Sequence, residues 1–84
     1  MPTISIFYGI HIMMYLKDKE HNPPHIHAYY GNKSASFLIL TGEILNGSFP
    51  SRAAKLVKEF IQIHQSELLE MWETGIYKAI EGLN

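Results

Sequence analysis

The sequence predicts an α+β fold: a three- to four-stranded antiparallel meander, followed by one kinked or two C-terminal helices packed on one sheet face. Three observations support this prediction. Before Pro50, apolar residues alternate with other residues, as in half-buried strands. After Pro50, apolar residues recur every three to four positions, as in amphipathic helices. Between two strand-like segments, the dipeptide Gly31-Asn32 favours a tight hairpin turn.

The first strand is predicted over residues 4–16, where apolar residues occupy every second position. We expect these even positions to face the core: Ile4, Ile6, Tyr8, Ile10, Ile12, Met14 and Leu16. Residues 17–24 are polar and end in two prolines, so a loop with a stiff, extended end is expected there.

A hairpin is predicted next, with strands over residues 25–30 and 35–40. A two-residue loop between them places Ala28 opposite Ala35, whereas a loop one residue longer would put apolar and serine positions on the same face. Residues 43–49 are the candidate for a fourth strand at the sheet edge.

Helices are predicted over about residues 51–64 and 66–75, with a single kinked helix as the alternative. Ser51 and Ser66 are the expected N-caps, because a serine hydroxyl can accept a hydrogen bond from a free N–H of the first turn. Ser48 is the alternative for the first helix if Pro50 lies in its first turn. Gly75 is the expected C-terminal stop.

Length and composition limit the function. The chain has 84 residues, so we expect one domain over residues 1–84. The net charge of −1 gives no general attraction for nucleic acid, although a local basic patch stays open. No apolar stretch is long enough for a bilayer and the N-terminus lacks the charged region of a signal peptide, so we expect a cytoplasmic protein without membrane contact.

The most unusual segment is His21-Asn22-Pro23-Pro24-His25-Ile26-His27. If even positions face the helices, odd positions share the other sheet face, and His21 is close enough in sequence to fold over it. That face would gather histidines and tyrosines from two strands and the loop: His11, Tyr15, His21, His25, His27 and Tyr29.

Metal binding is the first chemistry that fits this face. His25 and His27 are two positions apart on a strand, so both project the same way. Together with His21, or with His11 or Glu20, they could hold Zn²⁺, since imidazole is a good ligand for zinc and the chain has no cysteine. The cofactor stays open: zinc is the candidate, nickel and copper also suit imidazole ligands, and the sequence does not require any of them.

Acid–base catalysis is the second. His25 and His27 could act as base and acid in a small toxin-type ribonuclease, since imidazole changes charge near neutral pH. No nucleophile or phosphate-binding loop accompanies them.

Protein recognition is the third. His11, Tyr15, His21 and Tyr29 would form a binding surface for a partner protein or for a second copy of the chain. A single histidine can also be packed in the core or exposed to solvent without a functional role, and this is the interpretation for His64.

The segment Pro23-Pro24-His25-Ile26-His27-Ala28, with Gly42-Glu43-Ile44-Leu45-Asn46-Gly47 and the stretch around Trp72, resembles the bacterial family catalogued as domain of unknown function 4160. Its members are often encoded beside another short gene, and some are suspected of forming toxin–antitoxin-like pairs. The resemblance therefore implies a small regulatory or accessory module that acts with a partner protein. It strengthens the interest in His21, His25 and His27 without giving them a chemistry.

Overall fold

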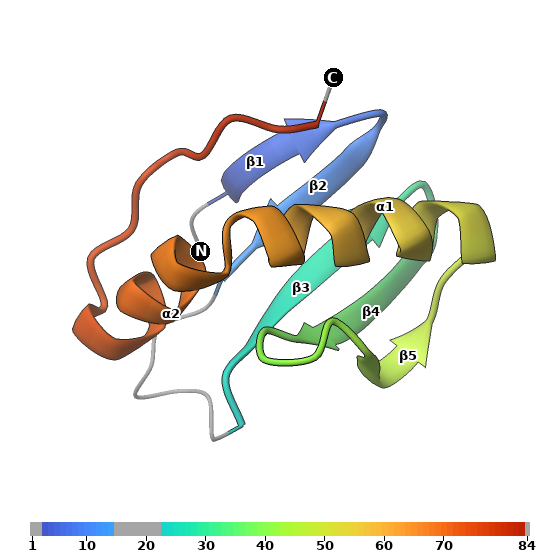
Figure 1. Ribbon diagram of the computed structural model, residues 1–84. Helices are drawn as coiled ribbons and strands as arrows, with labels where there is room; N and C mark the ends of the chain where they lie inside the picture. Colours follow the sequence, from blue (N-terminus) through green and yellow to red (C-terminus); the bar gives the residue numbers. More distant parts are fainter. Residues whose placement is uncertain (1–2, 15–22, 84) are drawn as a thin grey trace.

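The computed structural model describes residues 3–14 and 23–83 and has an antiparallel sheet of five strands in sequence order, with two helices after it (Figure 1). The elements are β1 (Thr3–Phe7), β2 (Ile10–Met13), β3 (His25–Tyr30), β4 (Lys33–Leu38), β5 (Ile44–Ser48), α1 (Ser51–Ile63) and α2 (Gln65–Thr74). The α+β class and the meander are as predicted. The predicted number of strands, three to four, was too low.

The extra strand arises from a tight turn at Tyr8-Gly9. Phe7 pairs with Ile10, and both turn residues have positive φ, 51° and 77°, which is the geometry of a type I′ hairpin. The single strand predicted over residues 4–16 was therefore wrong in its described part, because residues 3–13 form two strands. Alternating apolar residues continue through the turn and conceal it.

The turn also reverses which positions of β1 are buried. A two-residue loop places Phe7 on the same face as Ile10, so Phe7 is buried and Ile6 is 58% exposed. Ile4 is still buried, since a register shift between Thr3 and Ser5 reverses the alternation again. The expectation that Ile6 and Tyr8 belong to the core was wrong, and Leu16 lies outside the described residues.

The second hairpin has the predicted turn and register, but its second strand, β4, covers residues 33–38 and not the predicted 35–40. Tyr30 pairs with Lys33 across Gly31-Asn32, and Ala28 lies opposite Ala35. Gly31 has a φ of 60° at the first turn position, where a type II′ turn requires glycine.

The core lies between the sheet and the helices, which both pack on the same face (Figure 1). Phe7 of β1 stacks on Phe60 of α1 with ring centroids 5.0 Å apart. The core side chains contributed by the sheet come mainly from even positions of β2 and β3 and odd positions of β4: Ile10, Ile12, Ile26, Ala28, Ala35 and Phe37.

The two helices are separated at His64, whose φ of −110° and ψ of 23° depart from helical values. Pro50 is the N-cap of α1, and no side chain of the described residues caps its first turn, so the predictions of Ser51 and of its alternative Ser48 were wrong. The N-cap predicted at Ser66 was also wrong, because α2 already begins at Gln65. Gly75 ends α2 in the left-handed conformation, as expected. Within the described ranges, no helix has the length and apolar character needed to cross a membrane.

After α2 the chain returns along β1 (Figure 1). The Ile80 N–H donates to the Ile4 carbonyl at 2.7 Å.

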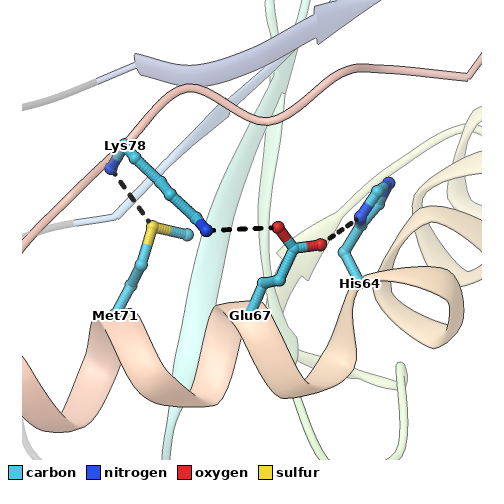
Figure 2. Close-up of polar contacts among 4 residues, drawn as sticks. All are labelled: His64, Glu67, Met71 and Lys78. Carbon is cyan, nitrogen blue, oxygen red and sulfur yellow. Dashed lines mark hydrogen bonds and ion pairs between the residues drawn. The ribbon is translucent and has the colours of Figure 1, made fainter.

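Polar contacts between α2 and the C-terminal segment are shown in Figure 2. The Lys78 N–H donates to Met71 Sδ at 3.4 Å, and Lys78 Nζ lies 3.5 Å from Glu67 Oε2. Glu67 Oε1 lies 2.8 Å from His64 Nδ1. The hydrogen bond with His64, followed by the contact with Lys78, lowers the pKa of Glu67 against the opposing effect of desolvation.

These contacts predict a pH-dependent contribution of Glu67 to stability. Because the folded pKa lies below the ordinary value of 4.5, the contribution is present above that value and is lost as the pH falls through the folded pKa. Thermal unfolding should therefore show Glu67→Gln less stable than wild type at neutral pH, with the gap closing in acid. Glu70→Gln, an exposed change on the same helix, is the control. An equal pH dependence for both variants would contradict the prediction.

Because of the turn at Tyr8-Gly9, we expect alanine substitution to destabilise the fold strongly at Phe7 and very little at Ile6. Phe7→Ala should lower the free energy of unfolding by about 3–5 kcal/mol, as expected for a buried phenylalanine. Ile6→Ala should change it by about 0.5 kcal/mol or less, as for other exposed positions. Urea unfolding of both variants checks this, and the reverse order would mean that the turn lies elsewhere.

Candidate functional site

The sheet face opposite the helices carries a row of side chains across all five strands. Cross-strand pairing aligns Ile6, His11, Tyr29, Ser34 and Ser48, from β1 to β5. Alternation puts these positions on the other side of the sheet from the buried neighbours of each strand. The row changes from apolar and aromatic on β1 to β3 to hydroxyl on β4 and β5. We call this side of the sheet the open face, because both described helices lie on the other side (Figure 1).

A second row on the open face contains Met13, His27, Ser36 and Asn46. The Ser36 Oγ lies 3.3 Å from His27 Nδ1, within hydrogen-bond distance. Together with Ser34, the last three residues of this row line a shallow polar hollow of about 240 Å³. The hollow presents an imidazole, two hydroxyls and an amide to solvent, groups that can donate or accept hydrogen bonds.

His25 occupies a different environment at the start of β3. Its side chain is only 7% exposed. Its ring lies 5.2 Å from the ring of Trp72 in α2 and 5.1 Å from that of His27, between centroids. Its Nδ1 lies 2.8 Å from the Pro23 carbonyl oxygen, which can only accept, so Nδ1 carries the proton and donates.

The proline pair explains how the sequence produces this arrangement. Pro23 and Pro24 restrict the backbone to extended conformations just before β3. The Pro24 carbonyl accepts a hydrogen bond from the Ile39 N–H at 3.1 Å, and the Pro23 carbonyl accepts one from His25. The prolines thus fix the orientation of the His25 ring rather than contacting a ligand themselves.

The predicted site residues separate into three groups. His11, His27 and Tyr29 lie on the open face as expected. His25, which alternation also predicted for this face, is instead buried, with its ring against Trp72 of α2. Tyr15 and His21 are outside the described residues, so their part in the predicted binding surface and metal site stays a prediction. Within residues 3–14 and 23–83, no three histidine or acidic side chains are placed to hold a metal together.

Sequence reasoning missed two contacts of this site. The Ser36–His27 hydrogen bond follows from the hairpin register, which places the two residues directly opposite each other, and could have been found. The Trp72–His25 contact could not, because it depends on where α2 ends relative to β3. The buried Trp72 Nε1 has no hydrogen-bond partner among residues 3–14 and 23–83, and its contact with His25 is one of ring against ring.

Comparison with known proteins agrees with the resemblance drawn from the proline–histidine segment. No curated protein and no solved structure matches the chain. One family model does, over residues 9–73, a range that includes the second strand, the histidine segment and nearly all of both helices. The chain therefore belongs to the family described as domain of unknown function (DUF4160).

Proposed function

We propose that the protein is a regulatory or accessory module that binds a partner protein through its open face. The observation that carries this proposal is a sheet whose two described helices, α1 and α2, both pack on the same face. On the other side, Ile6 is 58% exposed and His11 is exposed, next to each other across β1 and β2. A branched apolar side chain in water on a flat sheet favours burial by another surface.

The composition of the open face supports protein recognition over other ligands. Its apolar half combines Ile6 with Met13 and Tyr29, and methionine and tyrosine are enriched in protein interfaces. Serine and asparagine hydroxyl and amide groups on β4 and β5 supply a polar flank, as at the rim of such interfaces. No described lysine or arginine lies in either row, so the face gives little attraction for phosphate.

A different protein is a better occupant than a second copy. A two-fold dimer built on the centre of this face would bring histidines of one copy toward those of the other. A different chain can offer acidic or apolar groups to His11 and His27 instead. The family resemblance implies a short neighbouring gene as the source of such a chain, in the manner of a toxin–antitoxin-like pair.

The ribonuclease alternative receives less support. It needs His25 and His27 as a base and an acid that both reach substrate. His25 is 7% exposed and is covered by Trp72, with Nδ1 used by the Pro23 carbonyl. These contacts suit a structural role for His25, or a role as a metal ligand, better than proton exchange with a bound RNA.

A zinc site is the second candidate, and the hydrogen bond from His25 to Pro23 favours it. Histidines that bind metal through one nitrogen commonly donate the other N–H to a carbonyl, which fixes the ring. His25 has this arrangement, and the His27 ring is 5.1 Å away between centroids, near enough for both imidazoles to approach one ion. His21 remains the candidate for the third ligand.

The partner proposal predicts that binding depends on Ile6. We expect Ile6→Ser to weaken the complex with the neighbouring gene product about tenfold, because a buried branched side chain is lost from the interface. Ile63→Ser is the matched control, since Ile63 is 59% exposed but lies on α1. Light scattering of the co-expressed proteins and titration calorimetry give the stoichiometry and the affinity.

Three outcomes would count against the partner proposal. These are no association with the neighbouring gene product, equal weakening by both variants, or a stable homodimer that Ile6→Ser dissociates. The last outcome would assign the open face to a second copy of the chain.

The zinc candidate predicts about one equivalent of metal in untagged protein purified without chelator. His27→Gln should lose it, and His64→Gln should retain it, because His64 bonds Glu67 far from the open face. Binding should weaken in acid, since imidazole must be deprotonated to bind. Elemental analysis and a zinc titration followed by histidine NMR signals check this. Metal-free protein that takes up no zinc would remove this candidate.

A further inference from the structure

A second hollow lies at the other end of β3 from His25. The tip of the first hairpin, the last residue of β3 and the first turns of α1 enclose a volume of about 410 Å³. This size falls within the range of about 300–1,000 Å³ that is usual for small-molecule sites. None of the residues that line it belongs to the open face.

The walls of this hollow are mainly apolar and include two aromatic rings. Ile10 is fully buried at its base, and Ala53 and Leu56 line it from α1. Tyr8 and Tyr30 also line it and are 57% and 40% exposed. Two half-exposed rings above an apolar base suit a ligand with a flat, apolar body.

Tyr8 is held in a conformation that its turn requires but that a bulky side chain disfavours. It is the one described non-glycine residue with positive φ, at 51°. Glycine and asparagine adopt this region readily, and both are common at this position of a type I′ turn. A bulky residue that occupies a strained position beside a hollow indicates a use for its side chain, since such strain concentrates at binding sites.

The hollow also has a positive rim. Arg52 lines it and is exposed, and the ion pairs His64–Glu67 and Lys78–Glu67 of the described residues do not involve it. The first turn of α1 contains no acidic residue that would offset this charge. A planar guanidinium recognises carboxylate and phosphate groups through paired hydrogen bonds.

We propose that this hollow binds a small molecule with a flat apolar body and a single anionic group, a carboxylate or a phosphate. The body lies against Tyr8 and Tyr30 over Ile10, and the anionic group pairs with Arg52. This site is separate from the partner surface on the open face and does not depend on it. A small-molecule site would give an accessory module a means of sensing a metabolite.

The first test is an NMR titration of the labelled whole chain with three probes of similar shape: phenylacetate, phenyl phosphate and neutral benzyl alcohol. Either anion should shift the amide signals of Gly9, Tyr30 and Ala53, and the tighter of the two identifies the anionic group. Binding of neither anion at millimolar concentration would overturn the proposal. Binding of benzyl alcohol as tightly as the anions would also overturn it.

The charge requirement is tested by a matched pair of variants on α1. Arg52→Gln and Lys55→Gln each remove one positive charge from the same exposed helix turn, but only Arg52 lines the hollow. We expect Arg52→Gln to weaken anion binding about tenfold, as for the loss of a charged hydrogen bond. Lys55→Gln should change it less than twofold. Equal weakening would indicate general charge attraction and overturn the assigned contact.

The strained turn gives a test with effects of opposite sign. Tyr8→Asn should raise Tm by about 4 °C, because asparagine tolerates positive φ, and should weaken binding of the anionic probe several-fold because one wall is lost. Since the variant is expected to be more stable, a loss of binding cannot be attributed to unfolding. A variant that binds as well as wild type would overturn the role of Tyr8.

Discussion

The type I′ turn at Tyr8-Gly9 is the constraint on which most of this structure depends. By closing a hairpin after Phe7, it sends Phe7 to the helix face, where the ring stacks on Phe60. The same turn places Ile6 beside His11 on the open face, and it holds the Tyr8 ring at the edge of the second hollow. One two-residue loop thus determines a core contact, an exposed apolar residue and one wall of a pocket.

The turn also shows where the sequence was informative about the fold and where it was not. Gly31-Asn32 contains two typical turn residues between clear strands, and the hairpin there was predicted with its correct register. Tyr8-Gly9 offers one turn residue inside an uninterrupted run of alternating apolar residues. Local pattern therefore favoured a single long strand, and only pairing with the rest of the sheet separates β1 from β2. The bulge between Thr3 and Ser5 has no sequence signal that we recognise.

For the site, alternation was sufficient wherever a strand is regular. His11, His27 and Tyr29 share the open face because β2 and β3 are in register without a bulge between them. The environment of His25 was beyond such reasoning, since it depends on the tertiary position of Trp72 and on a hydrogen bond to a backbone carbonyl. The alternation of a strand predicts the face to which a side chain points, but not which residues of other elements cover it. For the same reason the second hollow was missed, because its walls come from three elements that meet only in the folded chain.

The edges of the sheet give a further reason to place recognition on its face. The open edge of a sheet is the usual place for an added strand, and proteins commonly block it. At β1 the returning C-terminal segment already donates the Ile80 N–H to Ile4, and a side chain at Gly82 would meet Phe7 at 2.7 Å. At β5 the register shifts between its pairing with Ser36 and with Phe37, and Gly47 has a φ of 88°, so this edge strand is irregular. Strand addition is thus hindered at both edges of the sheet. The two rows of the open face that contain His11 and His27 offer instead a regular, partly apolar surface across the middle of the sheet. For the proposed partner, the edges therefore favour side-chain contacts on this surface over an extension of the sheet.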